Sequence, residues 1–126
     1  FKSMSFYCNT YVFTYKSDKF NSAVTDYNNS IKGFNEFIDY RNKMFLPARS
    51  DSALKAMLVI AEDKLNDARS KLKGIVSPST QMLTMIESLG KSMDDLTARL
   101  NEQKEFVKEY FKKSKAQRKQ MFMSKN

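Results

Sequence analysis

The chain has 126 residues, the size of one ordinary domain, and it carries a formal net charge of +8. Glycine (3 residues) and proline (2 residues) are too scarce to supply the many turns of a sandwich, a barrel or a multi-strand α/β fold. Histidine does not occur in the sequence, which excludes Ser–His and Cys–His nucleophiles and removes the commonest zinc and iron ligand.

The first part of the chain is expected to form a helix over residues 3–45. From Phe20 to Phe45, apolar side chains recur at alternating intervals of four and three residues, which is the pattern of one face of a long amphipathic helix. Residues 3–16 also alternate aromatic and β-branched residues with small or polar ones, so this segment is either helix or strand. Helix is favoured because a lone strand would have no partner. If the polar residues near position 17 cap a fresh start, the helix is kinked there.

A second, shorter helix is expected over residues 51–73. Pro47 ends the first helix, because the residue before a proline disfavours the α conformation. Leucine and alanine side chains then repeat at four- and three-residue intervals, and Gly74 is placed to close this helix in the left-handed conformation. Gly33 in the first helix would let a neighbouring helix approach closely.

The third helix is expected over residues 78–121, with Ser77 as its N-cap and Pro78 in the first position. Its apolar ladder runs to Met121, and residues 122–126 are expected to be a frayed tail. Short connectors make consecutive helices antiparallel. Residues 1–126 are therefore predicted to be a single all-α domain. Its predicted form is a three-helix antiparallel up-down-up bundle with coiled-coil character, with two long helices and one shorter.

The unequal helix lengths predict a contact surface. The short helix can cover only residues 24–45 of the first helix and residues 78–100 of the third, at 1.5 Å rise per residue. The overhanging ends would keep apolar stripes without a partner inside the chain, and such stripes mark association surfaces. The residues expected to bind a partner are Phe6, Tyr7, Tyr11, Phe13, Phe20, Val107 and Tyr110.

A second candidate surface is basic. Residues 110–126 contain six cationic residues and no acidic one. On a continuous helix, five lysines would share one sector of about 80° opposite the apolar seam; they are Lys104, Lys108, Lys112, Lys115 and Lys119. Such a stripe can follow a phosphate backbone or anionic lipid, although a solvated helix face is the simpler interpretation.

These patterns favour a non-enzymatic structural or protein–protein interaction module, as part of a cell-envelope or secreted assembly. The expected partner is a second copy or another helical protein, and the alternative is nucleic-acid binding by the C-terminal basic helix. No catalytic residue, metal-ligand set, cofactor motif or small-molecule substrate is indicated. Neighbouring acids such as Glu62 and Asp63 point about 100° apart on a helix, so they cannot both face one reacting atom.

The composition of the chain does not fix its cellular compartment. The lone cysteine, Cys8, excludes an intrachain disulfide, and no run of apolar residues is long enough to span a membrane. The chain begins at Phe1 instead of methionine, which we expect to reflect processing or truncation and which favours the cell envelope or secretion.

Overall fold

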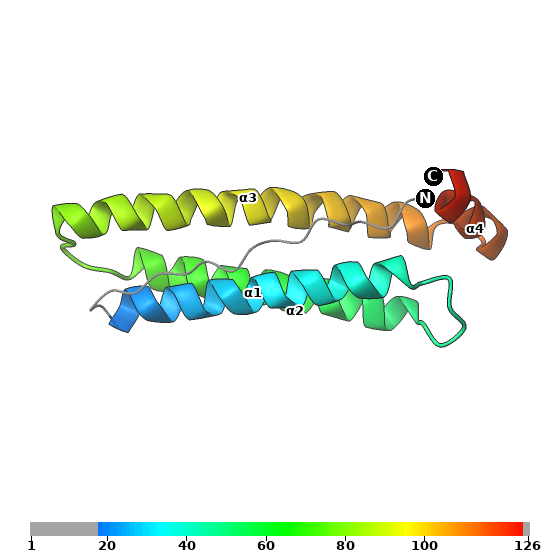
Figure 1. The fold of residues 1–126 in the computed structure, drawn as a ribbon, viewed down its shortest axis with the longest axis horizontal. Helices are drawn as coiled ribbons and strands as arrows, with labels where there is room; N and C mark the ends of the chain where they lie inside the picture. The colour runs from blue at the N-terminus through cyan, green and yellow to red at the C-terminus, as the bar shows by residue number, and fades with distance from the viewer. Residues whose placement is uncertain (1–17, 125–126) are drawn as a thin grey trace.

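In the computed structural model, the structure describes residues 18–124, with only the backbone described for Lys115 and residues 121–124. The described part is all-α, as predicted, and contains no strand. Its helices are α1 (Asp18–Asn42), α2 (Asp51–Lys73), α3 (Thr80–Phe111) and α4 (Lys115–Ser124), drawn in Figure 1. The expectations for residues 3–17, the helix-or-strand question and the kink near residue 17 among them, lie outside the described residues.

The first helix ends at Asn42, three residues before the expected end. The chain tightens there, since Lys43 N donates to Tyr40 O at 3.1 Å and Met44 N donates to Arg41 O at 3.2 Å. These bonds span three residues and not the four of an α-helix, so the turn toward Pro47 begins early.

The second helix has the bounds expected from the sequence, because its first turn is capped locally. Ser50 Oγ accepts a hydrogen bond from Ala53 N at 3.1 Å. At the other end, the expected left-handed Gly74 is wrong: its φ is −80°, and its N–H still donates to the carbonyls of the last turn. The left-handed residue is Ser77, with φ of 48°.

The start of the third helix also differs from the expectation. Ser79 is the N-cap, and its side chain accepts from Met82 N at 3.1 Å. Ser77 was expected in this role, but its left-handed backbone turns the chain before Pro78 and delays the helix by two residues.

The expectation of one helix over residues 78–121 is wrong, because α3 ends at Phe111 and α4 begins at Lys115. Ser114 and Gln117 form a reciprocal capping box at the break. Ser114 N donates to Gln117 Oε1 at 3.0 Å, and Gln117 N donates to Ser114 Oγ at 3.3 Å. The α4 backbone includes residues 122–124, which the sequence assigned to a frayed tail.

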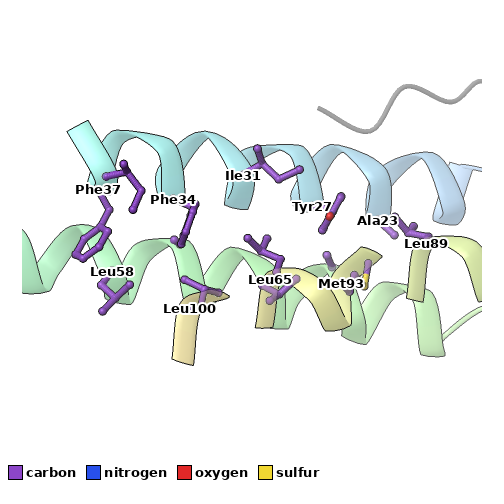
Figure 2. Packing of buried hydrophobic residues seen from close by; sticks show 14 of the residues in the cluster. Ala23, Tyr27, Ile31, Phe34, Phe37, Leu58, Leu65, Leu89, Met93 and Leu100 are labelled. Carbon is purple, nitrogen blue, oxygen red and sulfur yellow. The ribbon is translucent and has the colours of Figure 1, made fainter. Parts of the chain in front are cut away.

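The closest helix contact joins α1 and α2. A Cβ placed on Gly33 would lie 3.4 Å from Ala61 Cβ, so the expected close approach at this glycine is confirmed. Beside it, the buried Ser30 Oγ donates to Ala61 O at 2.6 Å. Figure 2 shows Tyr27 and Phe34 of α1 pointing toward the other helices, where core side chains of α2 and α3 lie.

The third helix lies along the other two with a shifted register. Tyr27 Oη of α1 donates to Ser92 O of α3 at 3.0 Å. Figure 1 shows the chain reversing direction at both connections, with the start of α3 projecting past the end of α2. The ion pairs between α2 and α3 reach Asp94, near the middle of α3, and Lys104, in its C-terminal half. This differs from the expected cover of residues 78–100, because the connector 74–79 carries the chain beyond α2 before α3 starts.

Candidate functional site

Three residues predicted to bind a partner are buried in the core of this chain. They are Phe20 of α1 and Val107 and Tyr110 of α3. No exposed apolar stripe remains at these positions: α2 lies opposite Val107, Arg118 lies over the Tyr110 ring, and Phe20 packs in the core cluster. Phe6, Tyr7, Tyr11 and Phe13 lie outside the described residues, so their expected contact role stays a prediction.

Tyr110 is also covered by Arg118 of α4. Arg118 Nε donates to Tyr110 O at 2.9 Å, and the guanidinium carbon lies 4.3 Å from the Tyr110 ring centroid. Both terminal nitrogens of the same guanidinium donate to the carboxylate of Asp51, the first residue of α2, at 2.9 Å. Burial raises the pKa of the Tyr110 phenol. Arg118 therefore joins α2, α3 and α4 at one corner, which the sequence analysis did not find.

A second cation is buried deeper in the helix contact. Arg41 of α1 lies with its guanidinium carbon 3.7 Å from the ring centroid of Phe106 in α3. Burial lowers the pKa of this guanidinium to about 10, so it remains charged at neutral pH. This cation–π contact binds α1 to α3, and we assign it a structural role.

The predicted lysine stripe is divided in the structure. Lys104 forms an ion pair with Glu62 at 2.7 Å, and Lys112 lies 3.6 Å from Glu109. Lys115 and Lys119 belong to α4, beyond the break after α3, whereas Lys108 is exposed on α3. The five lysines therefore do not lie on one continuous helix face.

A groove of about 390 Å³ lies between α2 and α3. Each wall supplies four residues at positions i, i+3, i+4 and i+7. They are Lys55, Leu58, Val59 and Glu62 from α2, and Lys104, Val107, Lys108 and Phe111 from α3. Two residues of each set are apolar, and Val59 is 48% exposed. The groove therefore has an apolar floor that solvent reaches.

The rim of this groove is basic. Three lysines and one glutamate line it, and the glutamate is held by Lys104 across the groove. Among the described residues, neither Lys55 nor Lys108 forms an ion pair. The charge left over at the rim is thus positive on both walls. An apolar floor between positive rims suits a ligand that is itself amphipathic and acidic.

The described part of the chain contains neither a metal-binding cluster nor a membrane-spanning helix. No group of three or more His, Cys, Asp or Glu residues there is arranged to hold a metal ion. None of the described helices combines the length and apolar character needed to cross a bilayer. Comparisons with protein families, with curated proteins and with solved structures found no match.

Proposed function

We propose that this chain is a non-enzymatic protein-interaction module whose α2–α3 groove receives an acidic amphipathic helix of a partner protein. The observation that carries the proposal is the matched i, i+3, i+4, i+7 spacing of the groove residues on both walls. Two neighbouring helices with this spacing present the recesses that receive apolar residues of a further helix, itself repeating at three and four residues.

We infer that the three long helices form an up-down-up antiparallel bundle with coiled-coil packing. Two pairs of contacts support the direction of α2. Asp26 pairs with Lys71 and Ser30 with Ala61, so residue numbers rise along α1 as they fall along α2. The pairs Arg69–Asp94 and Glu62–Lys104 relate α2 to α3 in the same way. A three-helix bundle of this kind has room for a fourth helix in an outer groove.

The positive charge of the rim favours an acidic partner helix over a second copy or the N-terminal segment. A second copy that used the same face would bring two positive rims together, and like charges close to each other disfavour association. The N-terminal segment of residues 1–17 contains no acidic residue, so it lacks the charge that the rim would attract. A partner helix with Asp or Glu on either side of an apolar stripe would place an acidic side chain opposite the lysine of each wall.

Nucleic-acid binding by the basic C-terminal region is the weaker alternative. Two lysines of the expected stripe are engaged by Glu62 and Glu109, and the stripe is interrupted after Phe111. A phosphate backbone needs a continuous run of available cations, because its contacts are distributed evenly along the strand. The apolar floor of the groove would also have no role in such binding.

The first prediction is that the groove binds a synthetic acidic amphipathic helix. The probe is a fluorescent peptide with leucine at i, i+3, i+4 and i+7 flanked by glutamate, and its affinity is measured by anisotropy. Val59→Asp and Lys108→Glu should each weaken binding about tenfold, since they place an acid on the floor or the rim. The matched control is Val76→Asp, at an exposed valine in the α2–α3 connector.

Two further measurements separate the outcomes. A peptide with lysine in place of each glutamate should not bind, because it repels the rim. Sedimentation of the chain alone tests whether a second copy occupies the groove. If the acidic peptide binds no better than the basic one, or if the groove variants bind as wild type, the proposal is wrong.

A further inference from the structure

The connector between α1 and α2 presents apolar side chains on a fixed turn. Phe45 is 66% exposed and Leu46 is 38% exposed. The turn is held by hydrogen bonds from Leu46 N to Lys43 O at 3.0 Å and from Arg49 N to Leu46 O at 3.3 Å. Met44, which is buried, anchors the turn to the core. The two apolar side chains therefore project from an ordered part of the chain.

The far side of this turn is fastened to α1 as well. Ser50 N donates to Tyr40 Oη at 2.9 Å, and the Arg49 guanidinium carbon lies 4.8 Å from the Tyr40 ring centroid. We name residues 43–50 the apolar tip. A small hollow of about 160 Å³ lies beside the tip, lined by Glu36, Asp39, Tyr40, Lys43 and Arg49, and neither Phe45 nor Leu46 lines it.

Basic residues gather at the same end of the molecule. The ion pair between Arg118 and Asp51 places α4 beside the start of α2, and Figure 1 shows α4 and the α1–α2 connector at one end. Residues 43–51 and 109–124 contain seven cationic and two acidic residues. Both acids are engaged, Asp51 by Arg118 and Glu109 by Lys112. Glu36 and Asp39 of α1 also lie beside Lys43 and Arg49. With them, this end has seven cationic residues against four acidic ones, so it keeps an excess of positive charge around exposed apolar side chains.

The opposite end of the molecule provides a contrast. It also exposes apolar side chains, since Val76 is 81% exposed and Leu83 is 46% exposed. Its charges are balanced, however, with Lys19 and Lys73 offset by Asp18 and Glu87. Of the two ends of the described bundle, the end with the apolar tip is the one that combines exposed apolar side chains with excess positive charge.

We propose that the end formed by the apolar tip and α4 docks on the surface of an anionic lipid bilayer. Phe45 and Leu46 enter the interface between headgroups and acyl chains, while cations such as Lys43 and Lys119 remain at the level of the headgroups. Anionic lipid attracts each nearby cation, and inserted apolar side chains add the hydrophobic term. This surface is distinct from the α2–α3 groove.

A bilayer fits these observations better than a nucleic acid. Phosphate contacts would use the lysines but would leave Phe45 and Leu46 in water. A bilayer surface is soft and broad, so it can take up Phe45 and Leu46 together without a shaped recess opposite them. The attachment is peripheral, since the described helices include none able to cross a bilayer.

The experiment is co-sedimentation of the full chain with vesicles. We expect binding to phosphatidylcholine vesicles that contain phosphatidylglycerol, with little binding to phosphatidylcholine alone. Phe45→Asp should reduce the partition coefficient about tenfold, because it removes an inserted ring and adds a repelled charge. Lys119→Gln should reduce it about fivefold, through one lost cation. Both positions are exposed, and circular dichroism checks that the variants remain folded.

Two control variants isolate the surface. Val76→Asp adds the same charge to an exposed apolar residue at the opposite end, and Val59→Asp changes the groove; both should bind vesicles as wild type does. Equal sedimentation with neutral and anionic vesicles would overturn the proposal. So would retention of binding by Phe45→Asp together with displacement by duplex DNA, which would identify a polyanion site in place of a bilayer.

Discussion

At the scale of single residues, the two helical glycines of the long helices have opposite surroundings. A Cβ on Gly33 meets Ala61 at 3.4 Å, whereas a Cβ on Gly90 meets nothing within 4 Å. A Cβ at position 33 would thus touch Ala61 at ordinary contact distance and leave no room for a larger side chain, whereas Gly90 only weakens its helix. The same residue type has a packing role at one position and a cost in helix propensity at the other.

This difference gives a paired prediction. Gly90→Ala should raise the free energy of unfolding by about 1 kcal/mol, the usual gain in helix propensity. Gly33→Leu should lower it by about 1–3 kcal/mol, because the larger side chain forces α1 and α2 apart. Urea denaturation of both variants and the wild type measures the two changes. A higher free energy of unfolding for Gly33→Leu would contradict the close contact with Ala61.

At the scale of elements, helix bounds are predictable from the sequence where the capping and apolar residues that set them lie close together in the chain. The bounds of α2 follow from Ser50 and from the run of apolar residues between Asp51 and Lys73, all close together in the chain. The break after Phe111 was missed because the apolar ladder continues across it to Met121. The signal that could have found it is the pair Ser114 and Gln117, a capping box inside the expected helix.

The candidate groove was not predictable in the same way. Its residues lie in two helices, and only the register of α2 against α3 brings Val59 and Val107 to one recess. That register depends on the connector 74–79, where Ser77 adopts a left-handed conformation that residues other than glycine rarely take. The apolar face of each helix was predictable from periodicity, but the offset between the two helices was not.

The prediction for the helices concerns Arg118 of α4, which contacts both α2 and α3. Arg118→Lys keeps the charge but loses the paired bonds to Asp51 and the stacking on Tyr110, since an ammonium lacks the planar guanidinium fork. We expect faster amide exchange throughout α4 and a loss of about 1 kcal/mol in the free energy of unfolding, a modest value because Asp51 is partly exposed. Lys119→Ala is the control, and equal exchange in both variants would show that Arg118 does not hold α4.

At the scale of the whole molecule, the two proposed surfaces use different side chains but adjoin near Phe111, at the end of α3. The groove lies along the flank of α2 and α3, and the apolar tip lies at the end where α1 turns into α2. Both depend on the same arrangement, because α4 reaches Asp51 only if α3 runs back toward the start of α2. The direction of α3 is thus the feature on which both proposed surfaces depend.

Distances between spin labels test that direction. In a Cys8→Ser background, labels at Lys55 and Lys112 should lie close, at about the 8–10 Å separation of packed helices plus the length of the labels. Labels at Lys55 and Glu87 should lie about 40 Å apart. Glu87 is 25 residues from Lys112, and these residues span about that distance at 1.5 Å rise per residue. If α3 ran in the opposite direction, the order of the two distances would reverse. If α3 were detached, both distributions would be broad, and neither the groove nor the basic end could form as described.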